Sequence, residues 1–147
     1  MLVGQVMTAA VVTAEPSLTM RGIAVLMRER NVGSVVLVDG AWPVGFITDR
    51  DVALCVVADG RDPESRAGDH ASTPVITAAP DMDLEEAADK MVRHGIRRLV
   101  VVESGALVGV VTFDDLVSRV GDRASALSAL ITRPATPDYF SRVREAS

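Results

Sequence analysis

The sequence predicts a mixed α/β protein (α+β in arrangement) built from two copies of one β-α-β-β-α unit. Residues 11–52 align on residues 75–116 without a gap, and twelve of the 42 pairs are identical. Within each copy, apolar residues first follow a helical spacing and then form the continuous runs typical of buried strands. A fixed internal period of this kind indicates duplication of one supersecondary unit. We therefore expect repeat 1 over residues 5–58, a linker over 59–69, repeat 2 over 70–121, and a tail over 122–147 that is partly helical or loose.

Each copy opens with a short strand and a capped helix. Residues 11–13 and 75–77 are β-type segments, and a proline follows each of them. Thr19 and Asp83 stand at equivalent N-cap positions, and Glu86 is placed to complete a capping box with Asp83. Behind the caps, apolar residues recur at i, i+3, i+4 and i+7: Met20, Ile23, Ala24 and Met27 in the first copy, and Leu84, Ala87, Ala88 and Met91 in the second. One face of each helix should pack on a sheet.

A hairpin and a second helix follow in both copies. Asn31 and Gly95 are the residue types that best tolerate the left-handed conformation at a helix end. The apolar runs 35–38 and 99–102 then predict buried strands, and residues 44–47 and 107–111 predict their hairpin partners. Second helices are expected over about 50–58 and 114–120.

Composition excludes several classes of protein. A chain of 147 residues that is 48% hydrophobic can bury one ordinary core. A net charge of −5 and an aromatic content of 3% both oppose nucleic-acid binding. The single cysteine, Cys55, has apolar neighbours and is expected to be a buried hydrophobe. Without a signal peptide or an apolar run of membrane-spanning length, the chain is expected to be cytoplasmic, with no membrane contact.

A motif of Gly, two apolar residues, Thr and Asp occurs at the same place in both copies, from Gly45 to Asp51 and from Gly109 to Asp115. The glycine permits a close turn, and the threonine, Thr48 or Thr112, precedes a helix whose first N–H groups can bind an anion. The aspartate can accept two hydrogen bonds from the hydroxyls of a ribose. The same residues also fit a helix capping box, so the motif alone leaves both interpretations open.

The second copy has two basic residues that the first lacks. Arg97 and Arg98 stand directly before the buried strand, where the first copy has Gly33 and Ser34. Guanidinium groups suit phosphate because they donate in a fixed fork. The alternative is a pair of solvated surface arginines. No metal site is expected, and no nucleophile, base and orienting group are spaced as in an enzyme, so no catalytic residue is assigned.

This order of elements, with its Gly-x-x-Thr-x-x-Asp motif, resembles the CBS (cystathionine β-synthase) domain, and its duplication resembles a tandem CBS pair, or Bateman module. The resemblance covers about residues 5–120, and the stretch from Met20 to Asp51 is particularly similar to small stand-alone bacterial CBS-pair proteins. It implies a disc with pseudo-two-fold symmetry and two clefts between the repeats for an adenosyl ligand. The implied ligand-binding residues are Thr112, Asp115, Arg97, Arg98, Val75, Ile76, Thr77, Thr48, Asp51, Val11, Val12, Thr13 and Ser34.

The resemblance implies a regulatory module without catalysis of its own. In the family pattern the aspartate holds the ribose, the threonine positions ribose or phosphate, the segment at the first strand contacts the base, and the basic residues meet phosphate. The candidate ligands are AMP, ADP, ATP, S-adenosylmethionine and NAD, and no cofactor is implied. A homodimer through the CBS helices and a separate protein partner are expected. The alternative is a ligand-free interaction or stress-response protein with the same fold.

Overall fold

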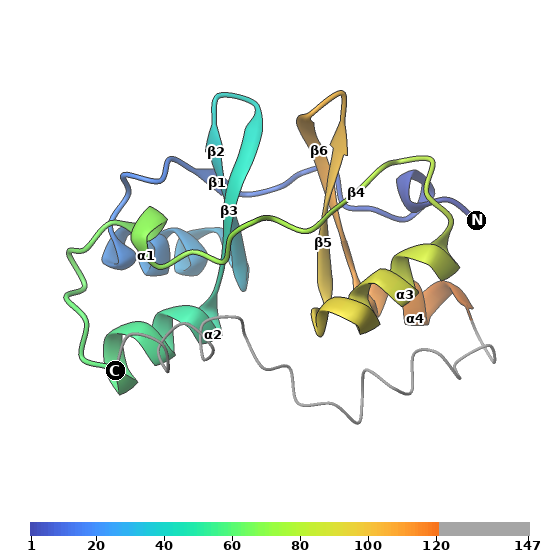
Figure 1. The fold of residues 1–147 in the computed structure, drawn as a ribbon. Coiled ribbons are helices and arrows are strands. Elements are labelled where there is room, and N and C mark those ends of the chain that lie inside the picture. Colours follow the sequence, from blue (N-terminus) through green and yellow to red (C-terminus); the bar gives the residue numbers. More distant parts are fainter. Residues whose placement is uncertain (121–147) are drawn as a thin grey trace. The chain divides into compact units, whose positions relative to one another are not determined.

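The computed structural model describes residues 1–120, and the expected tail lies outside them. The chain packs as two units. The first unit is Val11–Val75, and the second combines Met1–Ala10 with residues 76–120. Each unit holds a three-stranded sheet, in the order β1-β2-β3 or β4-β5-β6 (Figure 1). The predicted mixed α/β fold is confirmed.

The first unit contains β1 (Thr13–Ala14), α1 (Met20–Arg30), β2 (Ser34–Asp39), β3 (Trp42–Thr48) and α2 (Asp49–Val52). A π-helical segment, Ala53–Ala58, continues α2. Strand β1 is parallel to β2, and β2 is antiparallel to β3. The predicted apolar stripe of α1 is buried at Met20, Ile23 and Met27, and Cys55 is buried as expected.

The second unit repeats this arrangement with β4 (Thr77–Ala78), α3 (Leu84–His94), β5 (Arg98–Glu103), β6 (Ala106–Thr112) and α4 (Phe113–Val120). In Figure 1, α3 and α4 lie beside one another next to the sheet. Its core consists of apolar residues from α3, α4 and one face of the sheet, joined by one residue from the N-terminus: Val3, Ala78, Leu84, Ala87, Ala88, Met91, Leu99, Val101, Val111, Phe113 and Leu116.

The helix ends follow the sequence signals closely. Thr19 caps α1 by accepting a hydrogen bond from the Gly22 N–H at 3.0 Å. Asn31 and Gly95 both adopt the left-handed conformation, with φ of 52° and 63°. One prediction is wrong in detail: Asp83 accepts from the N–H of Glu85 at 2.8 Å, and not from Glu86. The cap uses the second residue of α3, so the expected capping box does not form there.

Two segments, each of which leads into one repeat, pack on the other repeat. Residues 1–8, the first crossing segment, join the second unit: the N–H of Val3 donates to the Met82 carbonyl at 2.8 Å, and that of Gly4 donates to the Pro80 carbonyl at 2.8 Å. Residues 65–72, the second crossing segment, make the equivalent bonds in the first unit, from Ala67 to Leu18 and from Gly68 to Pro16. Packing therefore divides the chain differently from the sequence repeats.

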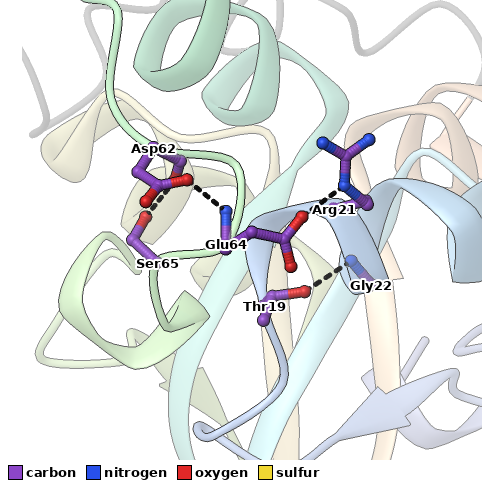
Figure 2. Close-up of polar contacts among 6 residues, drawn as sticks. All are labelled: Thr19, Arg21, Gly22, Asp62, Glu64 and Ser65. Atoms are coloured by element: carbon purple, nitrogen blue, oxygen red, sulfur yellow. Dashed lines mark hydrogen bonds and ion pairs between the residues drawn. The ribbon is translucent and has the colours of Figure 1, made fainter.

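The start of the second crossing segment and the two residues before it are anchored at the start of α1. The backbone N–H groups of Met20 and Arg21 donate to the carbonyls of Ser65 and Pro63 at 2.9 and 2.8 Å. Figure 2 shows Glu64 in an ion pair with Arg21 beside the Thr19 cap. Because the first N–H groups of a helix have no partner within it, these carbonyls satisfy donors that would otherwise need water.

Candidate functional site

Each motif lies where the last strand of its sheet runs into a helix. Thr48 ends β3 and caps α2, and Thr112 ends β6 just before α4. The N–H of Thr48 donates to Oδ2 of Asp51 at 2.8 Å, and the N–H of Asp51 donates to Oγ1 of Thr48 at 3.2 Å. Thr112 and Asp115 make the same two bonds, at 2.8 and 3.2 Å. Both copies therefore contain the reciprocal capping box that the motif predicted as one of its two interpretations.

The two caps differ in the hydrogen bonds of the threonine hydroxyl and in the exposure of the aspartate. In the second unit, the Thr112 hydroxyl also donates to Oδ2 of Asp115, at 2.8 Å. Asp51 is only 5% exposed, whereas Asp115 is half-buried. Burial raises the pKa of the Asp51 carboxyl above its ordinary value, since desolvation outweighs the bonds from Thr48. The more accessible aspartate is the one in the second unit.

The motif glycines serve a close approach, and the predicted close turn is wrong. Gly45 and Gly109 lie within β3 and β6, and neither has a positive φ. A Cβ added at Gly45 would lie 2.9 Å from the Cβ of Ala71, and one added at Gly109 would lie 2.6 Å from the Met7 sulfur. The glycines therefore leave room for the crossing segments, which sequence reasoning did not identify.

Strand pairing brings one basic residue beside the second motif. Arg98 is the register partner of Thr112, as Ser34 is of Thr48. Successive strand residues alternate between the two faces of a sheet. Leu99 and Val111 belong to the core beneath the helices, so Arg98 and Thr112 lie on the opposite face. Within residues 1–120, no ion pair of Arg98 is found.

Arg97 is held elsewhere. Its guanidinium lies over the ring of Phe113, 5.2 Å from the ring centre, and its carbonyl accepts from the Phe113 N–H at 2.8 Å. Phe113 belongs to the core that packs on the helical face of the sheet. The two neighbouring arginines therefore do not point to one place. Only Arg98 shares a face with Thr112.

The segments expected to contact a base lie at the same end of each sheet. The carbonyls of Val12 and Ile76 accept from the N–H groups of Val36 and Val100, at 3.1 and 3.2 Å. Thr13 and Thr77 are the register partners of the same two valines. Because β1 and β4 run parallel to their neighbours, their first residues lie beside the starts of β2 and β5. Of the remaining predicted residues, Val11 is half-buried in the first unit, and Val75 also packs with that unit.

The described part of the chain has neither a cluster of metal-ligating side chains nor a membrane-spanning helix. Residues 1–120 contain no group of three or more His, Cys, Asp or Glu side chains that could hold a metal ion. None of the helices in that range has the length and apolar character needed to cross a bilayer.

The chain belongs to the CBS domain family, whose model matches residues 3–58 and 67–122. The CBS domain-containing protein YhcV of Bacillus subtilis is 40% identical over 124 residues, which cover 84% of this chain and 89% of that protein. The CBS domain protein PAE2072 from Pyrobaculum aerophilum, solved with AMP, is 32% identical with a TM-score of 0.74, over 90% of this chain and all of that one.

A second solved relative carries other adenosyl ligands. The CBS domain pair of protein MJ0100, in complex with 5′-methylthioadenosine and S-adenosyl-L-methionine, is 27% identical with a TM-score of 0.73. The similarity covers 82% of this chain and 94% of that one. The predicted membership in the CBS family is thus confirmed.

Proposed function

We propose that this protein is a regulatory module that binds an adenosyl ligand and has no catalytic activity of its own. The observation that carries the proposal is the pairing of Arg98 with Thr112 on the sheet face away from the helices. Asp115 follows Thr112 by one helical turn. Solved relatives that bind AMP, 5′-methylthioadenosine and S-adenosyl-L-methionine support it.

In the second unit we assign the ligand groups by chemistry. The Asp115 carboxylate accepts from the ribose hydroxyls, because one of its oxygens remains beyond the Oδ2 used in the cap. Arg98 donates to a phosphate, and its position opposite Thr112 brings it to the ribose end of the ligand. Ile76 and Thr77 contact the base. Arg97 contributes indirectly, by holding the start of α4 through Phe113.

The first unit has the same motif without the arginine. Ser34 occupies the place of Arg98 beside Thr48, and Asp51 is more deeply buried than Asp115. A ligand there gains no guanidinium contact with phosphate. We therefore assign this site, together with Val11, Val12 and Thr13, to a less charged adenosyl compound, such as S-adenosylmethionine or 5′-methylthioadenosine.

Thermodynamic linkage couples ligand binding to the conformation of the protein. A ligand that prefers one conformation of the protein shifts the population towards it by its differential affinity. We propose that the module acts as a homodimer through its helices, in the cytoplasm, and passes the signal to a separate protein partner. Exposed apolar residues on helical segments support this surface: Val57 is 81% exposed and Val117 is 44% exposed.

Thermal-shift measurements with AMP, ADP, ATP, NAD and S-adenosylmethionine test the proposal. We expect AMP to raise Tm, and Arg98→Ser to weaken binding of AMP while leaving binding of adenosine unchanged. Arg93→Ser, at an exposed arginine of α3, is the matched control for loss of one positive charge. Equal loss of AMP and adenosine binding in Arg98→Ser would contradict the phosphate assignment.

The second candidate function is a ligand-free interaction protein. It is favoured by the completeness of the Thr48–Asp51 and Thr112–Asp115 caps, which give both motifs a structural role without any ligand. The exposed Trp42, at 60%, would suit a protein contact. A flat thermal response to the whole ligand panel would favour this alternative.

A further inference from the structure

The second crossing segment connects the two candidate sites by a short length of chain. The N–H of Ser72 donates to the Phe46 carbonyl at 3.0 Å, and Phe46 lies two residues before Thr48 in β3. Three residues after Ser72, the chain reaches Val75, Ile76 and Thr77. One end of this path is therefore fixed to the strand of the first motif, and the other end enters the base-contacting segment of the second unit.

The first crossing segment makes the mirror connection. Thr8 and Val110 exchange two backbone hydrogen bonds, of 2.9 and 3.0 Å, and Val110 lies two residues before Thr112 in β6. Three residues after Thr8, the chain reaches Val11, Val12 and Thr13. Each motif strand is thus bonded to the segment that continues into the other candidate site.

We propose that the crossing segments are the couplers between the two candidate sites. Docking of residues 65–72 on β3 holds β4 in register with β5, and docking of residues 1–8 on β6 holds β1 in register with β2. A ligand that orders one site then favours the docked state of the segment leading to the other. Only the assignment of the two ends as ligand sites rests on the proposed function; the mechanical coupling does not.

Two features make the segments suited to this role. Strands β1 and β4 contain only two residues each, so few backbone hydrogen bonds hold them in their sheets. Gly45 and Gly109 provide the space into which Ala71 and Met7 pack. A Cβ at Gly45 would lie 2.9 Å from the Ala71 Cβ, and a Cβ at Gly109 would lie 3.0 Å from the Thr8 carbonyl oxygen as well as against the Met7 side chain, so each would crowd its crossing segment.

Hydrogen exchange on the ligand-free protein provides the test. Gly45→Ala places a Cβ 2.9 Å from the Ala71 Cβ, and we expect local opening of residues 66–72 to increase by roughly 5- to 100-fold. The Val100 N–H, which donates to the Ile76 carbonyl in the second unit, should lose protection in parallel. Gly45→Ala combined with Ala71→Gly removes the clash and should restore both, which makes it the matched control.

The equivalent variant of the second unit, Gly109→Ala, and the unaltered protein provide two further exchange measurements. Gly109→Ala should expose the Thr8 N–H and, with it, the Val36 N–H that pairs with the Val12 carbonyl. In the unaltered chain, the amides of Ser72 and Val100 should open as one cooperative unit under mild denaturant. Exchange that increases only within the crossing segments, or independent opening of Ser72 and Val100, would overturn the coupling and leave the ligand-binding proposal untouched.

Discussion

The substitution Val3→Ala tests the crossed packing of the N-terminus. Val3 is fully buried in the core of the second unit, although repeat 1 begins within a few residues of it. Valine loses two methyl groups, at about 0.8 kcal/mol each, and the cavity that they leave adds to this cost. We expect a loss of about 2–3 kcal/mol in the free energy of unfolding, and a Tm lower by about 5–10 °C.

Leu2→Ala is the control for Val3→Ala, because Leu2 precedes Val3 directly and is 41% exposed. It should cost less than Val3→Ala, about 1–1.5 kcal/mol, because about two fifths of the residue is in contact with water in the folded state and its removal leaves no closed cavity. Calorimetry measures both variants, and hydrogen exchange locates the damage. We expect lost protection around Met91 and Leu99 in the second unit. Equal shifts in Tm for the two variants, or loss of protection in the first unit, would refute the packing.

Three further predictions follow from the buried Asp51 carboxyl, the helix ends and the contact of Arg97 with Phe113. Burial raises the pKa of Asp51 above its ordinary value. Between the ordinary and the raised pKa, the folded state binds more protons than the unfolded state. The free energy of unfolding therefore falls as pH rises through that window. Asp51→Asn should flatten this dependence in melts between pH 7 and about pH 4; a curve parallel to that of the unaltered protein would contradict it. Gly95→Ala should cost about 1 kcal/mol by denaturant titration, because φ there is 63°, whereas Asn31→Gly should change stability by less than about half of that. Arg97→Ala should lower Tm by about 1–3 °C through loss of its stacking on Phe113, and an unchanged Tm would remove the positioning role.

Local signals allowed the elements to be predicted well. Asn31 and Gly95 are unlike residues that end equivalent helices in the same left-handed conformation, and sequence chemistry anticipated both. The buried strands and the Thr48–Asp51 cap followed from patterns spanning a few residues. Such signals suffice because each depends on neighbours along the chain.

The crossing segments could not be predicted, because duplication makes their partners equivalent. Val3 and Gly4 could bond to Leu18 and Pro16 of repeat 1 or to Met82 and Pro80 of repeat 2. The two pairs of carbonyls stand at equivalent positions in the repeats. Backbone acceptors carry no sequence identity. The choice is made by tertiary packing, and the role of the motif glycines was missed for the same reason.

The sequence alone could have predicted that Arg97 and Arg98 point to opposite faces of the sheet. Adjacent residues at the start of a strand point to opposite faces. Leu99 and Val101 are core residues, so alternation places Arg98 on the opposite face and Arg97 on the core side. The aromatic residue on which Arg97 stacks, Phe113, replaces Asp49 of the first copy, and only the structure brings the two side chains together.

Isothermal titration of AMP into the unaltered protein and into Asp115→Asn tests the central claim most directly. The asparagine oxygen can still accept from the Thr112 N–H, so the helix cap is kept while the charged acceptor for ribose is lost. We predict saturable binding to the unaltered protein and affinity weaker by roughly 10- to 100-fold in the variant, as expected for a hydrogen bond to a charged group. Equal affinity in the two folded proteins, or no binding to either, would contradict the account.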